Sequence, residues 1–554
     1  MKNLIYRYQI QKNIFKEKLS STDLLNISLK NSSNPISKNI NVWMNHNFET
    51  ILTYMKPYFT YQDMDIKIRV SNYDYSLMFQ DHIDASLEII FLDLEKFKDR
   101  LNSYEILTWL NQRIIHLRNI SSGTILLLTW DENITTDIEN FINNIPQCYY
   151  VDLLKLSKNK NIKFLDMRLK EITGTKLSKH LQIILAREIA CKFVPAFFFS
   201  SVKAICLDLD NTLHCGVLGE DGIDGVIVTP QHKILQAYLK KLKDSGIFLA
   251  LVSKNNEEDV KNLFKSRNDY VLSLNDFSAL EISWDDKSDS ITKIANKLKI
   301  GIDSILFVDD NIGELLSVIE AHRNIRAVLA CEDATVTKDI IENYPGIFRW
   351  SVTQEDKKRI EDLRNNDLRE HLSNAEQSDE EYFKNLEVSL VYSINCRDHL
   401  NRITDLCNKT NQFNLCLNRF NQIDVSQRLE NDRSSIITVE LSDRLSDSGI
   451  IGVIIADLEN KKLVIKELCI SCRAMGRRLE NIIISRAIRL MPIFEKCETV
   501  HFDVKIGPRN LPALKWINQL TNEVIDTNNL VTIDKNVFEM FNPVDGVKMR
   551  IKNG

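Results

Sequence analysis

The apolar positions of the first 200 residues fall into short runs that alternate with helically spaced segments. Short apolar runs predict buried strands, and apolar residues at three- and four-residue spacing predict helices that pack against them. This alternation predicts an α/β layer on a largely parallel sheet. The predicted strands are 39–44, 86–94 and 123–130, and the predicted helices are 106–117 and 179–190. Residues 1–35 are polar and weakly periodic, which predicts a mobile or accessory arm.

A second alternating set begins at residue 202, and a third follows residue 386. The second set has predicted strands at 204–209, 247–252, 270–273, 304–308 and 326–330. One of its helices is predicted to bury a face made of Ile234, Leu235, Tyr238, Leu239 and Leu242. The third set has predicted strands at 436–441, 450–458, 463–470 and 500–504, and predicted helices at 477–491 and 510–520. The charged stretch 351–381 predicts a solvated connecting helix.

The length of 554 residues requires more than one hydrophobic core. We therefore expect α/β domains at 1–200, 201–345 and 386–554, with a helical linker at 346–385. A net charge of -5 disfavours nucleic acid as a partner, because phosphate backbones bind basic surfaces. The eleven cysteines are scattered along the chain without a disulfide-like spacing, which favours a reducing cytoplasm. The most apolar run, 193–199, is too short to span a membrane, so we expect no membrane association.

Four acids and a hydroxyl follow predicted strands of the second set, and a lysine lies between two of these strands. Asp208 and Asp210 come at the end of 204–209, Ser253 follows 247–252, and Asp309 and Asp310 follow 304–308. Lys287 lies in the segment WDDKSDSI. Ligands of open parallel sheets bind beyond the carboxyl ends of the strands, so these side chains are candidates for one site.

Phosphoryl transfer is the chemistry that this residue set favours. A carboxylate can attack phosphorus to form an aspartyl-phosphate, which divides one difficult step into two. Clustered acids repel one another unless a hard cation such as Mg²⁺ binds their oxygens. A hydroxyl and a lysine would bind the transferring phosphoryl oxygens. Taken one at a time, the Asp pairs are also compatible with helix caps or solvated turns.

The order LDLDNT, Ser, Lys, Asp-Asp resembles the haloacid-dehalogenase superfamily. The resemblance implies a Rossmann-like domain with Asp208 as the nucleophile. It also implies that Asp210 protonates the leaving group and later activates water. The implied phosphate-binding residues are Thr212, Ser253, Lys254, Asn255 and Lys287. The implied Mg²⁺ ligands are Asp208, Asp309 and the backbone carbonyl of Asp210, with Asp310 in support.

Longer stretches are similar to the FkbH-like enzymes of that superfamily. They are DLDNTLHCGVLGEDG, WDDKSDSI, FVDDNIGE, KTNQFNLCLNRF, LSDRLSDSGIIGVII and SCRAMGRRLE. The resemblance implies a glyceryl transferase and phosphatase that acts on 1,3-bisphosphoglycerate. It would make a glyceryl thioester, remove the remaining phosphate and load the glyceryl group onto an acyl carrier protein for polyketide or related biosynthesis. A phosphatase or acyltransferase for another hydroxyacyl, sugar or amino substrate remains an alternative, as does a non-enzymatic scaffold.

The sequence departs from the family pattern in the flap after DNTL. The family commonly has Trp-Gly-Gly there, whereas this chain has His214-Cys215-Gly216. The acyl group recognised would differ if the flap contacts it, and Cys215 is a candidate reactive thiol. A replaced packing residue is the simpler interpretation. The flap 216–225 is too short for a separate cap domain.

The last domain resembles GNAT acyltransferases. Arg473-x-x-Gly476 matches the first half of their pyrophosphate signature, in which amides at a helix start hold the phosphates. Arg478 replaces the second small residue, which favours the phosphopantetheine of a carrier protein over coenzyme A as acceptor. Cys472, at the predicted strand–helix junction, is the candidate acyl-carrying residue, because helix dipoles and Arg473 favour a thiolate. Candidates for the acyl pocket or the downstream helix are Asn411, Gln412, Asn414, Asp443 and Asn510.

The first domain resembles a degenerate SGNH hydrolase. After the strand 39–44 the chain reads NHNFET instead of Gly-Asp-Ser, and Leu177 stands where an acid would precede His180. Without a serine or an acid there is no catalytic triad. The resemblance therefore implies a scaffold or a docking surface for the carrier protein.

Overall fold

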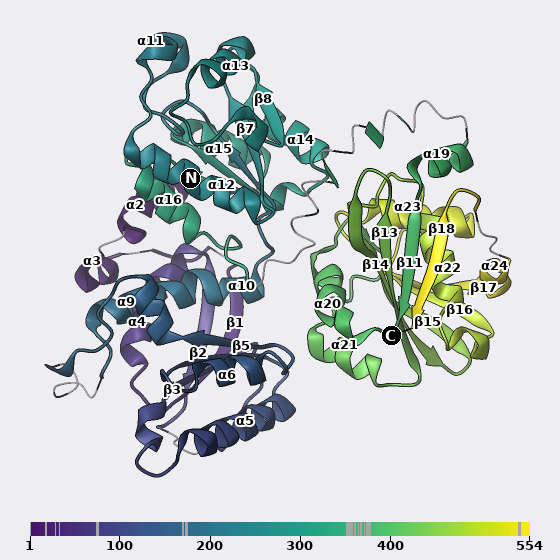
Figure 1. The fold of residues 1–554 in the computed structure, drawn as a ribbon, viewed down its shortest axis with the longest axis horizontal. Helices are drawn as coiled ribbons and strands as arrows, with labels where there is room; N and C mark the ends of the chain where they lie inside the picture. The colour runs from purple at the N-terminus through teal and green to yellow at the C-terminus, as the bar shows by residue number, and fades with distance from the viewer. Residues whose placement is uncertain are drawn as a thin grey trace.

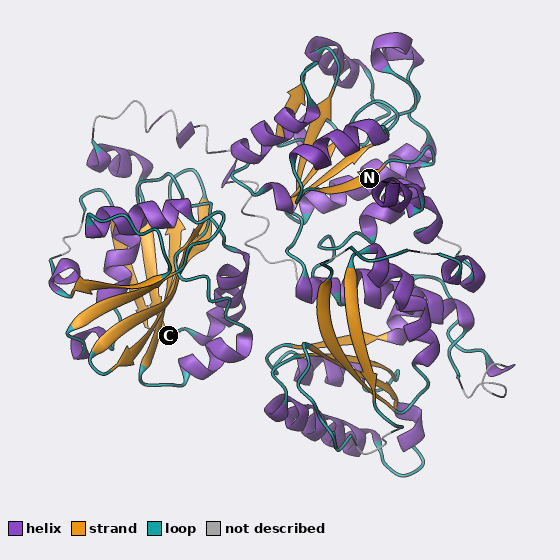
Figure 2. Cartoon of the chain, turned by 180° about the vertical axis from the view of Figure 1, so that it is seen from behind, coloured by secondary structure: helices purple, strands orange, loops and turns teal. Residues whose placement is uncertain are grey.

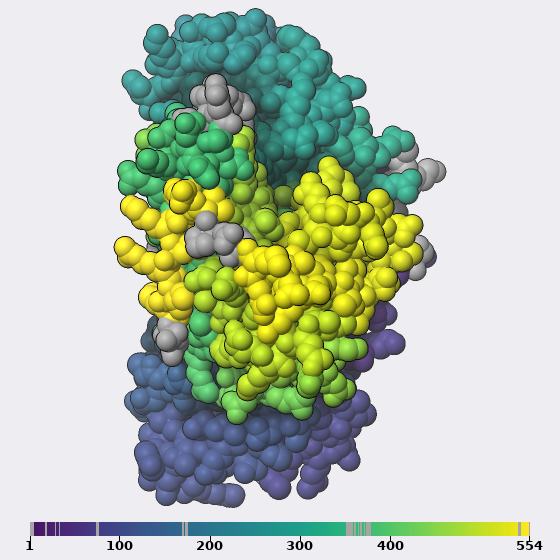
Figure 3. Space-filling model, turned by 90° about the vertical axis from the view of Figure 1, so that its right-hand side faces the viewer, coloured from purple at the N-terminus to yellow at the C-terminus, as the bar shows by residue number. Residues whose placement is uncertain are grey.

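The computed structural model describes residues 2–553, apart from 17–18, 28, 33, 74–76, 169–170, 172–174, 351–357, 359–361, 364, 366–367, 370–371, 373–377 and 541–543. The described residues form three sheets that follow one another along the chain. The first and central sheets lie in a stack, and the third sheet with its helices lies beside both (Figure 1, Figure 3). Helices cover the sheets on both sides (Figure 2), so the predicted α/β fold is confirmed.

The first sheet is parallel throughout, in the order β2-β1-β3-β4-β5. Its strands are β1 (Ile36–Met44), β2 (Met64–Val70), β3 (Leu87–Asp93), β4 (Thr124–Trp130) and β5 (Cys148–Asp152). Its helices are α4 (Glu49–Tyr61), η1 (Leu94–Phe97), α5 (Ser103–Ile120), α6 (Thr135–Ile142), α7 (Leu153–Asn159), α9 (Lys179–Glu188), η2 (Ile189–Phe193) and α10 (Pro195–Phe198). Ile89 and Ile90 enter apolar clusters on opposite faces, because successive strand side chains alternate.

The N-terminal segment forms three short helices, α1 (Lys2–Gln9), α2 (Gln11–Ile14) and α3 (Ser21–Leu25). Gln11 is fully buried, and its Nε2 donates to Tyr61 Oη at 2.5 Å. Its Oε1 accepts from the Leu329 N–H at 3.1 Å, at the edge of the central sheet. The expectation of a mobile arm is wrong, because this glutamine and the buried Ile14 and Phe15 join the segment to both neighbouring sheets.

The central sheet is also parallel throughout, in the order β10-β9-β6-β7-β8. Its strands are β6 (Ala204–Leu207), β7 (Phe248–Ser253), β8 (Ala279–Ile282), β9 (Ile305–Asp309) and β10 (Arg326–Leu329). Its helices are α11 (Leu218–Gly225), α12 (Pro230–Asp244), α13 (Glu257–Ser266), η3 (Leu274–Asp276), α14 (Lys287–Lys297), η4 (Ile302–Ser304), α15 (Ile312–Ala321) and α16 (Ala334–Glu342). One buried apolar cluster continues from the first sheet into this one.

Two predictions for the central sheet were wrong. Residues 270–273 are not a strand, since the amides of Val271 and Leu272 donate to the Oε1 atom of the buried Gln236 at 2.8 and 3.2 Å. A side chain of α12 thus satisfies these amides where a sheet partner would otherwise be needed. On α12 itself, Ile234 is 51% exposed, so the buried face is narrower than the apolar pattern predicted.

The third sheet is mixed, in the order β17-β16-β15-β14-β13-β11-β18, with β12 paired to β15. Its strands are β11 (Ser389–Ile394), β12 (Phe413–Asn414), β13 (Ser434–Ser442), β14 (Asp447–Glu459), β15 (Lys462–Ile470), β16 (Thr499–Val504), β17 (Asn529–Asp534) and β18 (Lys548–Asn553). Its helices are α19 (Asp379–Leu386), η5 (Arg397–His399), α20 (Leu400–Lys409), α21 (Gln422–Leu429), α22 (Glu480–Arg489), η6 (Phe494–Lys496), α23 (Leu511–Thr521) and α24 (Asn536–Glu539). Ile436 and Ile437 enter clusters on opposite faces.

Most of the predicted connecting helix at 351–381 lies outside the described residues. Among the residues that are described, no helix has both the length and the apolar character needed to cross a membrane.

Candidate functional site

The carboxyl edge of the central sheet brings the predicted acids together. Asp208 directly follows β6, Ser253 ends β7 and Asp309 ends β9. Strands β6, β7 and β9 are adjacent and parallel, so their ends reach the same edge of the sheet. The Asp208 N–H donates to the Val308 carbonyl at 2.9 Å, which continues the β6–β9 pairing as far as the nucleophile candidate.

Lys287 joins two of these acids. It is the first residue of α14, and its side chain is 5% exposed. Its Nζ lies 3.0 Å from Asp208 Oδ1 and 2.6 Å from Asp309 Oδ2. A buried lysine that contacts both carboxylates partly offsets their mutual repulsion and fixes the distance between them.

Asp208, Asp309 and Asp310 each place a carboxylate oxygen within 4.8 Å of the other two. Burial raises the pKa of all three carboxyl groups, and the charge of Asp309 raises those of Asp208 and Asp310 further. If all three are ionised, one lysine leaves two negative charges uncompensated. Clustered carboxylate oxygens are the donors that Mg²⁺ prefers, and a divalent cation would balance this charge. The residue set therefore fits Mg²⁺, with Asp310 in the cluster itself.

The Asp210 carboxylate does not join this cluster and is held by three donors. Oδ1 accepts from His214 Nε2 at 3.1 Å and from the Leu218 N–H at 3.0 Å, and Oδ2 accepts from Asn255 Nδ2 at 2.9 Å. Burial alone would raise the pKa of Asp210, but these hydrogen bonds outweigh burial and lower it. Asp210 is thus more readily ionised than the three clustered acids.

The remaining predicted phosphate-binding residues differ in position. Ser253 is buried, and its Oγ accepts from Asn255 Nδ2 at 3.0 Å. Thr212 is buried, and its Oγ1 has no hydrogen-bond partner among the described residues. Lys254 Nζ pairs with Glu314 on α15 at 2.6 Å, and Glu314 lies near enough to Asp309 for its charge to raise the pKa of that carboxyl. The structure therefore brings Ser253 and Asn255 to the acids and engages Lys254 in an ion pair with Glu314.

The flap contains a single short helix, α11, with a kink at Gly222, where φ is 70°. An isolated antiparallel bridge between Cys215 and Ile227 closes its base. Cys215 is exposed, whereas His214 is fully buried.

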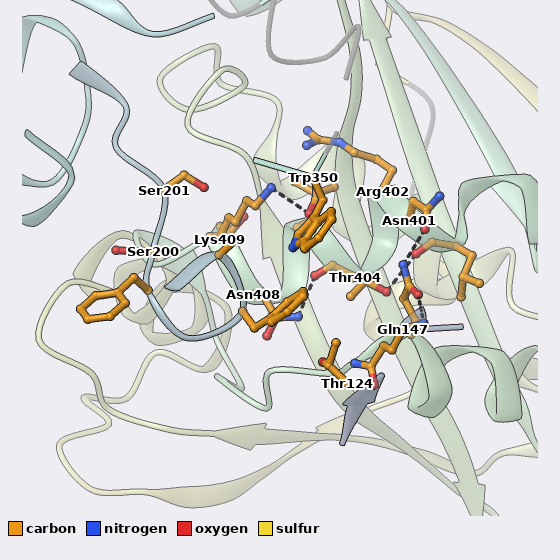
Figure 4. Close-up of a pocket in the computed structure, with 18 of the residues that line it drawn as sticks. Thr124, Gln147, Ser200, Ser201, Trp350, Asn401, Arg402, Thr404, Asn408 and Lys409 are labelled. Carbon is orange, nitrogen blue, oxygen red and sulfur yellow. Dashed lines mark hydrogen bonds and ion pairs between the residues drawn. The ribbon is translucent and has the colours of Figure 1, made fainter. Parts of the chain in front are cut away.

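A second candidate site is a cavity of about 1130 Å³ where the three sheets meet (Figure 4). The first sheet contributes Thr124 and Gln147, and Trp350 projects into the same space. The central sheet contributes Lys203 and Lys299. The third contributes polar and basic side chains and a thiol: Asn401, Arg402, Thr404, Asn408, Lys409, Asn411, Gln412, Cys472 and Arg473. The cavity therefore combines amides, cations, the acids Glu139, Asp303, Asp398 and Asp405, and one partly exposed cysteine.

The surroundings of Cys472 differ from the expectation in one respect. Residues 472–478 form turns, and α22 begins only at Glu480. The helix-dipole reason for an activated thiol does not apply, because that effect falls off within the first turn. The Gly476 N–H donates to Glu480 Oε1 at 3.1 Å, so this amide is not free to bind a phosphate. Arg478 pairs with Asp379 at 2.6 Å.

Asp443 does not line the cavity. It lies in a buried ion network, where Oδ2 accepts from Arg369 Nε at 2.9 Å and from Arg477 Nη1 at 3.0 Å. Arg477 Nη2 also lies 3.1 Å from Asp362 Oδ1. These contacts hold residues of the segment before the third sheet against β13 and β14, so Asp443 has a structural position.

Asn510 and Asn414 are also fully buried outside the cavity. Asn510 Nδ2 donates to the carbonyls of Asn414 and Lys505 at 3.0 and 2.7 Å, and its Oδ1 accepts from the Gly507 N–H at 2.9 Å. Asn414 Oδ1 accepts from the Leu417 N–H at 2.7 Å. Both amides satisfy backbone groups of neighbouring loops. Asn411, Gln412, Cys472 and Arg473 are the predicted acyl-site residues that the cavity does collect.

The two sites lie at opposite edges of the central sheet. Lys203 and Ser304 precede β6 and β9 and line the cavity, whereas Asp208 and Asp309 stand at the far ends of the same strands. From Lys203 to Asp208 the chain advances five residues, which is about 17 Å in an extended strand.

In the first sheet, His82 Nε2 and Ser121 Oγ both contact Glu88 Oε1, at 2.9 and 2.8 Å, so this serine bonds to the acid and not to the imidazole. Leu177 is fully buried, and His180 is exposed on α9. His46, which follows β1, is buried beside aromatic rings, and burial lowers its pKa to about 4.

Two features of these sites escaped the sequence analysis: the contact of His214 with Asp210, and the part of the first sheet in the cavity. His214 lies four residues after Asp210, but the number of residues between them does not reveal how the turn folds.

No protein-family model matches the sequence, and no curated protein matches it. Among solved structures, the chain is similar to the N-terminal part of the protein BF1531 from Bacteroides fragilis, containing a phosphatase domain complexed with Mg. That similarity has 21% identity and a TM-score of 0.44, over 60% of this chain and 96% of the other. A GCN5-related glucosamine N-acetyltransferase region in a fungal multi-domain GH3 beta-N-acetylglucosaminidase is similar at 9% identity and a TM-score of 0.18, over 93% of this chain and 66% of the other.

Proposed function

We propose that the chain is a Mg²⁺-dependent enzyme of haloacid-dehalogenase type that combines phosphate removal with acyl transfer. The contact of Lys287 with both Asp208 and Asp309 carries this proposal, because it joins a candidate nucleophile and metal-binding oxygens from two strands to a cation from α14. The finer proposal is a glyceryl transferase that uses 1,3-bisphosphoglycerate and an acyl carrier protein.

In the phosphatase half, an Asp208 oxygen attacks phosphorus and forms an aspartyl-phosphate as the bond to the leaving oxygen breaks. Asp210 gives a proton to that oxygen and then takes one from the water that hydrolyses the intermediate. Lys287 and Ser253 bind the phosphoryl oxygens. Mg²⁺ held by Asp208, Asp309 and the Asp210 carbonyl would stabilise negative charge on the phosphoryl group.

In the acyl half, the Cys472 sulfur attacks the acyl phosphate carbon, and phosphate leaves with the electron pair of the broken C–O bond. The acyl group then passes to the thiol of a phosphopantetheine arm, and Cys472 regains its proton. Arg473 and the amides of the cavity support this assignment, since they can bind a phosphate and hydroxyl groups.

The test is the intact mass of a phosphopantetheine-bearing acyl carrier protein after incubation with enzyme, Mg²⁺ and 1,3-bisphosphoglycerate. We expect the carrier to gain a glyceryl group. A parallel reaction with free pantetheine as acceptor makes the outcome independent of the choice of carrier. Two variants are the controls. We expect Asp208→Asn to leave a phosphoglyceryl adduct on the acceptor, and Cys472→Ser to give no adduct.

Release of phosphate without a glyceryl adduct on either acceptor would favour the alternative, in which the substrate is another hydroxyacyl, sugar or amino compound. The buried His214 and exposed Cys215 in the flap are the observation that favours this alternative. Absence of both phosphate release and adducts would contradict the enzymatic proposal.

A further inference from the structure

His214 lies between Asp210 and Tyr270 and contacts both. Its side chain is fully buried, with Nε2 3.1 Å from Asp210 Oδ1 and Nδ1 2.7 Å from Tyr270 Oη. The two rings lie edge to face, with centroids 6.1 Å apart and an interplanar angle of 86°. Tyr270 is itself packed against Phe264 of α13, at a centroid distance of 5.0 Å. The imidazole is therefore fixed from both sides.

The direction of these hydrogen bonds follows from the groups involved. An ionised carboxylate only accepts, so His214 Nε2 carries the hydrogen that it donates to Asp210. In a neutral imidazole the other nitrogen is then an acceptor, and the Tyr270 hydroxyl donates to Nδ1. The order of donation is thus Tyr270 to His214 to Asp210.

The two oxygens of Asp210 are unequally occupied. Oδ1 accepts two hydrogen bonds, from His214 and from the Leu218 N–H, and Oδ2 accepts one, from Asn255. A carboxylate oxygen has about two acceptor positions, so Oδ1 is filled and Oδ2 retains one. Oδ2 is therefore the oxygen with room for a proton.

We propose that His214, held by Tyr270, is a positioning residue that directs proton transfer by Asp210 to its Oδ2 atom. This inference rests on the proposed role of Asp210 as the acid of phosphoryl transfer. While the Asp208 oxygen bonds to phosphorus, the proton on Oδ2 moves to the leaving oxygen, which departs with the electron pair of its bond to phosphorus. His214 keeps its own proton throughout and holds Oδ1.

The test compares leaving groups that differ in their need for a proton. The nitrophenolate of 4-nitrophenyl phosphate leaves without one, whereas the alkoxide of glycerol phosphate must be protonated as it departs. Single-turnover release of the two leaving groups, with enzyme in excess over substrate and Mg²⁺ present, reports this step before hydrolysis of the aspartyl-phosphate. We expect His214→Ala to slow glycerol release by about tenfold to 100-fold and nitrophenolate release by less than about twofold.

Two further variants separate positioning from packing. His214→Gln retains a side-chain N–H donor, and we expect it to restore most of the glycerol release. Tyr270→Phe removes the hydroxyl that orients the ring, and we expect an intermediate loss, again confined to the alkyl substrate. Tyr238→Phe is the matched control, because Tyr238 lies on α12 with Lys338 over its ring at 5.5 Å, and we expect no change.

Equal loss for both substrates, or no loss in folded His214→Ala, would overturn the inference. So would a His214→Gln variant that folds but is no better than His214→Ala on glycerol phosphate. The proposed function fails in a different way, because the wild-type enzyme would then release neither leaving group. Near-ultraviolet circular dichroism of each variant checks that the fold is retained.

Discussion

Lys287 and Asp309 form a buried ion pair, with 2.6 Å between Nζ and Oδ2. The lysine sits at the start of α14 and the aspartate at the end of β9, so the pair also joins a helix to the sheet. Asp208 shares the same ammonium group. Removing the lysine would leave adjacent buried carboxylates without a positive partner.

Lys287→Met therefore tests whether the cluster is built for a cation. We expect the free energy of unfolding to fall by about 3 kcal/mol without divalent cations, since breaking a buried pair leaves uncompensated charge. Mg²⁺ should recover part of this loss, because it can replace the missing positive charge. Urea unfolding with and without Mg²⁺ measures both effects. A variant that Mg²⁺ does not stabilise would contradict metal binding by these acids.

The stability of the metal-free protein should fall as the pH rises. Burial raises the pKa of Asp208 from 3.8 to about 7. Between these values the folded state binds more protons than the unfolded state, so this carboxyl contributes most stability below pH 3.8 and loses its contribution as the pH approaches about 7. Urea unfolding without divalent cations at about pH 5 and about pH 8 measures the slope.

Asp208→Asn provides the control for that slope, because the amide does not titrate. We expect it to reduce the loss of stability between the two pH values. Added Mg²⁺ should stabilise the wild type more at the higher pH. The same slope in wild type and Asp208→Asn would show that Asp208 is not responsible.

Cys472→Ser should abolish the covalent acyl-enzyme, as measured by intact mass after incubation with 1,3-bisphosphoglycerate in the absence of an acceptor thiol. Cys215→Ser is the matched control, because Cys215 is exposed in the flap and lies outside the cavity. Burial in β6 raises the pKa of Cys206, so this thiol is unsuited to attack. If the adduct survives in Cys472→Ser and disappears in Cys215→Ser, Cys215 in the flap is the residue that carries the acyl group.

Asp443→Asn distinguishes a structural residue from an acyl-site residue. The change removes the charge that pairs with Arg369 and Arg477, and we expect a loss of about 3 kcal/mol in the free energy of unfolding. The yield of acyl-enzyme per folded molecule should not change. A stable variant that forms no acyl-enzyme would show that Asp443 is needed at the acyl site.

The positions of the acids in the central sheet could be predicted because they follow from the local sequence pattern. Each follows an apolar run, and parallel strands carry whatever follows them to a common edge. Ser253 and Asp309 are 56 residues apart in sequence, yet β6 separates their strands by a single position in the sheet. The fold class could be predicted for the same reason, from the alternation of strands and helices.

What could not be predicted depends on contacts that no local pattern encodes. The apolar pattern predicts a strand that begins at Tyr270, but Gln236 accepts the hydrogen bond of the next backbone amide. The Tyr270 hydroxyl contacts His214. The sequence predicts Asp443 in the acyl pocket, whereas the structure pairs it with Arg369. No local pattern reveals this pair, because the two residues are far apart in sequence. Cys472 was placed at a helix start, although the chain first makes a series of turns before α22.

The length of β6 imposes a condition on any reaction that uses both the cavity and the acid cluster. Lys203 lines the cavity that contains Cys472, and Asp208 is about 17 Å further along β6, so a three-carbon acyl group cannot contact both ends of the strand at once. Under the proposed function, the acyl group must leave on a long swinging thiol arm or escape into solvent between the two events. Small free thiols added during turnover should then intercept it as a soluble phosphorylated thioester.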